Sequence, residues 1–109
     1  MLTDVDAHRQ ADLEEQIRNA LQDESVPKIY LNGFVNSLGA GDVMVVLLRA
    51  RQPVAVLNMS YTVAKTLAQK LGTMIVELEN QSGNVIMSTD DVNEVMSRAR
   101  GRDEDPDNR

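Results

Sequence analysis

The segment from Asp42 to Leu48 has the sequence DVMVVLL and is apolar at every position after its aspartate. A strand with one solvent-facing side should alternate apolar and polar residues, because successive side chains point to opposite faces of the sheet. Here both alternating sets are apolar: Val43, Val45 and Leu47 on one face, and Met44, Val46 and Leu48 on the other. One helix covers one face of a small sheet. We therefore expect a second helix or a second copy of the chain to cover the other face.

Two more predicted strands flank this segment, at residues 28–36 and 54–59, and short turns rich in glycine or proline separate the three. Such consecutive strands are typical of an antiparallel meander. A long amphipathic helix follows, with Ser60 as its N-cap and Gly83 just past its end. Residues 85–87 could add a fourth edge strand. The sequence therefore predicts an α+β fold, a small antiparallel β-meander of three to four strands with one long helix across it.

The segments outside this core differ from it in composition. We predict an acidic N-terminal helical arm over residues 1–26, a core domain over residues 27–88, a short C-terminal helix over residues 89–101 that stops at Gly101, and a disordered tail over residues 102–109. The arm has a narrow apolar stripe suited to a partner protein of unknown identity. Its residues are Leu13, Ile17 and Leu21.

Charge and cysteine content limit the classes of function. The net charge of −6 sits mostly at the ends: residues 1–25 hold seven acidic and two basic residues, whereas residues 26–59 carry a net charge of +2. Acidic ends disfavour non-specific binding to nucleic acid or anionic membranes. The chain has no cysteine, which excludes disulfides and thiolate metal sites. With no secretory signal and no apolar run near the ~20 residues that cross a bilayer, we expect a cytoplasmic protein without membrane contact.

Groups suited to catalysis or metal binding are sparse. His8, the sole histidine, lies in the acidic arm away from any nucleophile. Asp90, Asp91 and Glu94 share one turn at the start of a predicted helix. Acidic residues at this position stabilise the helix through its dipole, and this role explains them better than binding of a cation does. The sequence Gly39-Ala40-Gly41 joins two strands and opens no helix, so the logic of a phosphate loop does not apply. We therefore predict no catalytic residues, no cofactor and no metal site.

Interaction with another molecule is the remaining function, and the sequence is compatible with two kinds of interaction. The first is a self-associating, non-catalytic assembly subunit of a larger prokaryotic complex, forming a homodimer or higher oligomer. Its expected self-association residues are Tyr30, Phe34, Met44, Val46 and Leu48. The alternative is a small nucleic-acid-associated regulator. Its expected contacts are Lys28, Arg49, Arg51 and Lys65, although the chain offers few aromatic residues for stacking on bases.

The core also resembles a known family. Tyr30-x-Asn32 opens the similarity, and its most specific part lies in the helix and beyond: Ser60, Ala64-Lys65, Leu67, Leu71, Ile75, Glu79, Gly83 and Ile86. Over about residues 28–87 this pattern resembles a small bacterial and archaeal family described only as a domain of unknown function. The chain departs from the family pattern at Tyr61, where a proline is usual, and at Leu78, where an aromatic residue is usual. The resemblance implies a strand-strand-strand-helix core and no particular chemistry.

Overall fold

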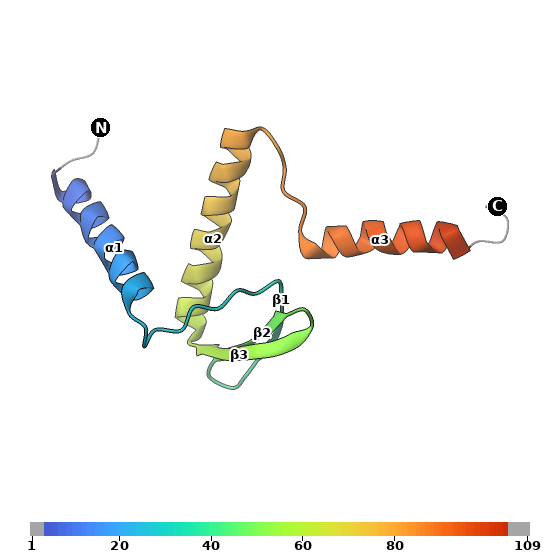
Figure 1. The fold of residues 1–109 in the computed structure, drawn as a ribbon, viewed down its shortest axis with the longest axis horizontal. Helices are drawn as coiled ribbons and strands as arrows, with labels where there is room; N and C mark the ends of the chain where they lie inside the picture. The colour runs from blue at the N-terminus through green and yellow to red at the C-terminus, as the bar shows by residue number, and fades with distance from the viewer. Residues whose placement is uncertain (1–3, 105–109) are drawn as a thin grey trace. The chain divides into compact units, whose positions relative to one another are not determined.

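The computed structural model describes residues 4–104 of the chain. Its elements are the helix α1 (Asp4–Gln22), the strands β1 (Gly33–Leu38), β2 (Val43–Arg49) and β3 (Gln52–Met59), and the helices α2 (Tyr61–Ser82) and α3 (Thr89–Glu104) (Figure 1). The chain divides into two compact units, Met1–Leu31 and Asn32–Arg109. The predicted α+β class, an antiparallel meander with one long helix after it, is confirmed. The prediction that this helix lies across the sheet is wrong, because in the described residues α2 does not pack along the sheet.

The three strands form one antiparallel sheet with β2 at its centre, in the order β1-β2-β3. The first strand begins at Gly33 and not at Lys28 as predicted. Asn32 explains this boundary, because its backbone N–H donates to the carbonyl of Leu48 at 3.0 Å and its side-chain oxygen accepts from the N–H of Ala50, also at 3.0 Å. The asparagine thus closes the end of the sheet at the β2–β3 turn, and the ladder starts with the next residue.

The β1–β2 turn is held by polar contacts around Asp42. The N–H of Gly39 donates to the carbonyl of Asp42 at 2.8 Å, and the carboxylate of Asp42 accepts from the side-chain amide of Asn58 on β3 at 3.1 Å. A Cβ atom at position 39 would lie 2.7 Å from an oxygen of that carboxylate. A side chain at position 39 would therefore require the Asp42 carboxylate to move, and the loop serves strand connection.

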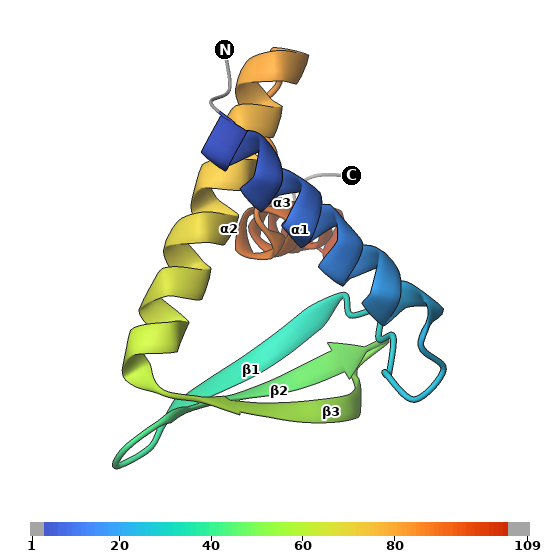
Figure 2. The same ribbon diagram turned by 90° about the vertical axis from the view of Figure 1, so that its left-hand side faces the viewer.

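Both predicted ends of α2 are confirmed. The Ser60 hydroxyl accepts from the N–H of Val63 at 3.2 Å, and Gly83 adopts a left-handed conformation with φ 75° while its N–H donates to the carbonyl of Glu79 at 2.9 Å. The Tyr61 hydroxyl donates to the carbonyl of Gly39, which ties the first turn of α2 to the β1–β2 turn. Figure 2 shows α2 leaving the end of β3 and rising away from the strands.

Two predictions downstream of α2 are wrong. Residues 85–87 form no strand, because the N–H of Ile86 donates to the carboxylate of Glu79 at 2.8 Å in place of a neighbouring strand. The last helix does not stop at Gly101 but continues to Glu104. Gly101 keeps an ordinary helical φ, and a glycine inside a helix costs only about 1 kcal/mol. Of the predicted tail, residues 102–104 are thus helical and residues 105–109 lie outside the described residues.

Side-chain burial within one copy is slight. Leu47, at the centre of β2, is 7% exposed and is the sole buried hydrophobic residue of the described chain. In α2, Ala64 and Glu79 are half-buried, and the other residues are exposed. In the described part of the chain, α2 does not pack along a face of the sheet. The fold of one copy therefore consists of a hydrogen-bonded sheet and helices whose apolar sides lack a partner.

Candidate interaction surface

One face of the sheet presents a row of three valines. The strand register places Val46 of β2 between Val35 of β1 and Val56 of β3. Val35 is 57% exposed and Val56 is 54% exposed, while Val46 is half-buried between them. Met44 and Leu48 lie on the same side of β2 because they are two residues away from Val46. We call these five residues the valine face; it is aliphatic and open in a single chain.

The opposite face of the sheet is also apolar and is more covered along its central strand. Leu47 lies between Phe34 and Ala55, and the next row of this face places Val45 between Asn36 and Leu57. This face contains the single buried residue, and its central strand is at least half-buried at each position. Asn36 is the one polar residue in these rows, whereas Ser37 and Asn58 flank Met44 on the valine face. The valine face is therefore distinguished by its openness, because the row of Val46 is less buried than the row of Leu47.

This register separates the residues predicted for self-association. Met44, Val46 and Leu48 lie together on the valine face, whereas Phe34 pairs with Leu47 on the opposite face. Tyr30 precedes the sheet and belongs to the N-terminal unit. The sequence prediction missed Val35 and Val56, which complete the valine row. The signal that could have found them is strand alternation combined with the hairpin register, which a sequence with an unassigned turn type does not specify.

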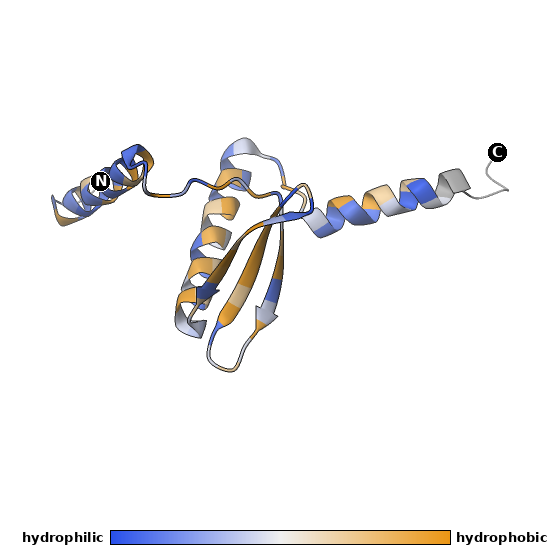
Figure 3. Ribbon diagram, turned by 60° about the horizontal axis from the view of Figure 1, so that its bottom comes forward, coloured by the Kyte–Doolittle hydropathy of each residue, from blue (hydrophilic) through white to orange (hydrophobic). Residues whose placement is uncertain are grey.

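The long helix carries a second apolar surface. At 3.6 residues per turn its large apolar residues, apart from Tyr61 and Val76, fall within a stripe about 140° wide when Ala64 and Ala68 are included. Within one chain, the exposed fraction of these side chains ranges from 43% for Leu67 to 61% for Met74. Figure 3 shows hydrophobic residues along the strands and along α2. We call this surface the α2 stripe; its large residues are Val63, Leu67, Leu71, Met74, Ile75 and Leu78.

The predicted partner-binding residues of the arm lie on α1. Leu13, Ile17 and Leu21 recur every four residues and so lie one above another on one side of this helix. All three are exposed, with Leu21 at 65%. The surrounding residues of α1 are polar, so the stripe is narrower than that of α2. Its geometry suits one partner helix, and no partner is identified by it.

The basic residues considered for nucleic acid do not converge. Arg49 and Arg51 lie at the β2–β3 turn, whereas Lys65 lies in the second turn of α2, beyond the opposite end of β3. The eight residues of β3 span roughly 25 Å at about 3.3 Å per residue. Lys28, in the N-terminal unit, donates to the backbone carbonyl of Asp23. The three core bases thus form no continuous basic patch within their unit.

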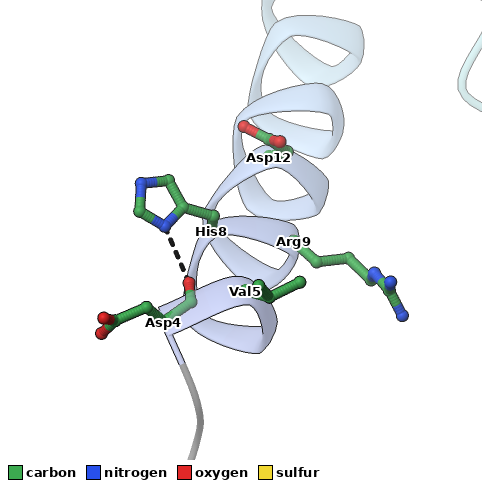
Figure 4. A pocket seen from close by; sticks show the side chains of 5 residues that line it. All are labelled: Asp4, Val5, His8, Arg9 and Asp12. Atoms are coloured by element: carbon green, nitrogen blue, oxygen red, sulfur yellow. Dashed lines mark hydrogen bonds between the residues drawn. The ribbon is translucent and has the colours of Figure 1, made fainter.

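The hollows of the surface contain no arrangement of catalytic groups. One lies on α1 alone and is lined by five residues that project from successive turns of that helix (Figure 4). In it the ring Nδ1 of His8 donates to the backbone carbonyl of Asp4 at 2.7 Å. Another lies by the β2–β3 turn, where Phe34 and Arg51 line it together with Asp90 of α3. In neither hollow does the described structure show a hydroxyl hydrogen-bonded to a histidine or a carboxylate, as an activated nucleophile would be.

Possible metal ligands and carboxyl groups with a shifted pKa give little further indication of a binding or catalytic site. Among residues 4–104, no three histidine or acidic side chains come together as a metal site would require. The Ser25 hydroxyl, and secondly its backbone N–H, bind the Asp23 carboxylate and hold the pKa of Asp23 below its usual value. This aspartate closes the turn after α1, which is a structural role. None of the described helices is long and apolar enough to cross a membrane.

Comparison with known proteins does not identify a relative of this chain. No family model, no curated protein and no solved structure matches the chain. The resemblance of residues 28–87 to a prokaryotic family of unknown function therefore stays a prediction, and the candidate surface must be interpreted from its own chemistry.

Proposed function

We propose that this protein is a non-catalytic, self-associating assembly module whose folded form contains at least two copies. The single observation that carries the proposal is that Leu47 is the sole buried hydrophobic residue of the described chain, while two large apolar surfaces remain open. A soluble monomer rarely exposes such contiguous apolar patches, and where they occur they mark interaction sites. Association of identical chains around a two-fold axis is the commonest way to cover them.

The size of the effect supports the same function. Burying a valine, leucine, isoleucine or methionine side chain fully contributes roughly 1.5–3 kcal/mol. The valine face and the α2 stripe together hold eleven such side chains, most of them about half exposed in one copy. Covering them offers roughly 10 kcal/mol of gross hydrophobic free energy, which is comparable to the whole stability of a small domain. Assembly is thus expected to be coupled to folding.

The mass of the protein in solution, measured by light scattering during size exclusion, tests the proposal. We expect a dimer or a larger closed assembly and a thermal midpoint that rises with protein concentration, since association stabilises the folded chain by mass action. Val46→Asp places a carboxylate at the centre of the valine face and should abolish assembly, giving an unfolded chain or a soluble monomer.

A charge-matched control separates the surface from the overall charge. Gln69→Glu adds the same negative charge to α2 on the side opposite its stripe and should leave the mass and the midpoint unchanged. A stable monomer for the unsubstituted protein, with a midpoint independent of concentration, would contradict the proposal. So would a Val46→Asp variant that keeps both the mass and the midpoint.

The acidic arm extends this proposal to a second partner. We propose that Leu13, Ile17 and Leu21 form a docking stripe for another protein of the same complex, used after the core has assembled. Replacing Ile17 with Glu should then leave the core assembly intact. Loss of assembly in this variant would instead assign α1 to the self-association surface.

A further inference from the structure

We infer that α2 of one copy lies on the valine face of a second copy, so that two chains exchange their long helices around a two-fold axis. This arrangement rests on the proposed self-association and specifies which surfaces meet. Each copy contributes one α2 stripe and one valine face. The two-fold axis therefore creates two identical contacts, and in each of them the α2 stripe of one copy covers the valine face of the other. The occupant of the valine face is therefore a second copy of this chain, contributing its α2.

The shape of the helix surface favours a sheet as its partner. A helix that pairs with one other helix through a narrow seam needs apolar residues only at alternating three- and four-residue spacings. The α2 stripe is wider, about 140° at 3.6 residues per turn, because Val63 and Ile75 flank the seam formed by Leu67, Leu71 and Leu78. A stripe of this width is what a helix needs to cover a broad apolar surface. The valine face, which extends over three strands, is such a surface.

The anchors of α2 argue against closure onto its own sheet. Ser60 alone separates β3 from α2, and it caps the helix in an extended conformation with ψ 159°. The hydrogen bond from Tyr61 to the carbonyl of Gly39 adds a second anchor, on the β1–β2 turn. With these contacts in place, α2 rises from the end of β3 and does not pack along the sheet of its own chain (Figure 2). The helix keeps both anchors if the sheet that it covers belongs to another copy.

The available area is that of a stable interface. A large aliphatic side chain covers roughly 60–120 Å² of apolar surface. Eleven such side chains about half exposed thus present roughly 330–660 Å² of apolar surface per copy. A standard interface uses about 800 Å² per partner, of which about 60% is non-polar. The two surfaces of one copy together supply this amount, whereas either one alone supplies about half of it.

Cross-linking between unlike chains tests the exchange directly, and the absence of native cysteine makes each introduced thiol unique. A tagged Leu71→Cys chain is unfolded and refolded with an untagged Val56→Cys chain and treated with a short thiol-reactive cross-linker. We expect a covalent pair of unlike chains. Replacing Val56→Cys by Leu57→Cys, which moves the thiol to the other face of the same strand, should lower the yield at least tenfold. Gln69→Cys, on the opposite side of α2, should lower it equally.

Each alternative arrangement leaves its own product. A covalent pair formed between two Leu71→Cys chains in preference to unlike chains would overturn the inference in favour of helix–helix pairing. A cross-link inside one chain of a Leu71→Cys/Val56→Cys double variant would overturn it in favour of closure onto the chain's own sheet. A higher yield with Leu57→Cys would assign α2 to the opposite face. A monomeric mass for the unsubstituted protein would defeat the proposed function itself, whereas a dimer with any of these three products defeats only the exchange.

Discussion

The central strand β2 and the long helix α2 are both strongly apolar, yet their side chains are buried to different degrees within one chain. β2 lies between two neighbouring strands and holds the buried Leu47, while the large apolar side chains of α2 remain about half exposed. The difference comes from what each element needs. A strand satisfies its backbone groups by pairing with strands close in sequence, and here both partners lie within a few residues. A helix satisfies its own backbone and needs a partner only for its side chains.

Under the proposed association, this contrast divides the fold between copies. Backbone pairing is completed inside one chain, and the side chains of the valine face and of α2 become packed when a second copy binds. The sheet alone is not sufficient, because a small sheet gains independent stability only with three or more strands and a packed hydrophobic face. Folding of the sheet and association of the copies are therefore expected to occur together.

Truncating one residue in each element is the strongest way to break this comparison. Leu47→Ala removes the side chain that is buried within one copy and should cost about 2–5 kcal/mol of unfolding free energy. Leu71→Ala should cost about 2–3 kcal/mol if another copy covers the α2 stripe, and less than about 0.5 kcal/mol if the helix stays in solvent. Denaturant unfolding at several protein concentrations measures both. A negligible cost at Leu71, matching that of the control Gln69→Ala, would remove α2 from the interface.

The β2–β3 turn offers the next largest effect, and it acts on the sheet alone. Ala50 and Arg51 have φ values of 51° and 69°, a left-handed conformation that side-chain-bearing residues adopt at a cost of about 1–2 kcal/mol each. Two-residue hairpin turns of this kind prefer Asn-Gly. The double change Ala50→Asn with Arg51→Gly should raise the unfolding free energy by about 1–2 kcal/mol. Thermal unfolding of this variant beside Arg51→Lys, which keeps the left-handed residue, measures the gain.

Absence of any gain would mean that the turn is held by its neighbours rather than by its own residues. Asn32, whose side chain accepts from the N–H of Ala50, is the neighbour to test in that case.

Local patterns allowed much of the fold to be predicted from the sequence. Ser60 and Gly83 bound α2 as expected, because a capping hydroxyl and a left-handed glycine act within one turn of the helix. The two-faced strand was recognised from alternation alone, since its apolar pattern does not depend on distant residues. These features are local, and local chemistry suffices for them.

The misassigned boundaries depended on partners distant in sequence. The start of β1 is set by Asn32, which is bound to Ala50 eighteen residues later. The carboxylate of Glu79 occupies the N–H of Ile86, so the expected fourth strand does not form. Two of the five residues of the valine face were missed for the same reason, since Val35 and Val56 join Val46 only through the hairpin register. Propensity and periodicity carry no information about such pairings.

Gly72 within α2 and Gly83 just past its end should respond to substitution in opposite directions, which sharpens the description of the surroundings of this helix. A Cβ atom at Gly72 would meet nothing within 4 Å, so Gly72→Ala should raise the unfolding free energy by about 0.5–1 kcal/mol. Gly83 has φ 75°, so Gly83→Ala should lower the unfolding free energy by about 1 kcal/mol. Circular dichroism melts compare the two. A loss of stability at Gly72 would place another backbone against this side of α2, which the single chain does not supply.

The smallest expected effect concerns the turn after α1, which is held by local polar contacts alone. Hydrogen bonds from Ser25 lower the pKa of Asp23, so the charged carboxylate is favoured in the folded turn. A depressed pKa contributes stability that is present above the unfolded value and is lost as the pH falls through the folded one. We therefore expect the turn to loosen as the pH falls below the ordinary aspartate range. Ser25→Ala should raise the pKa of Asp23, as NMR titration of its carboxyl group would show. An unchanged titration curve would mean that the turn persists without the Ser25 hydroxyl, so that its backbone N–H suffices to hold the carboxylate.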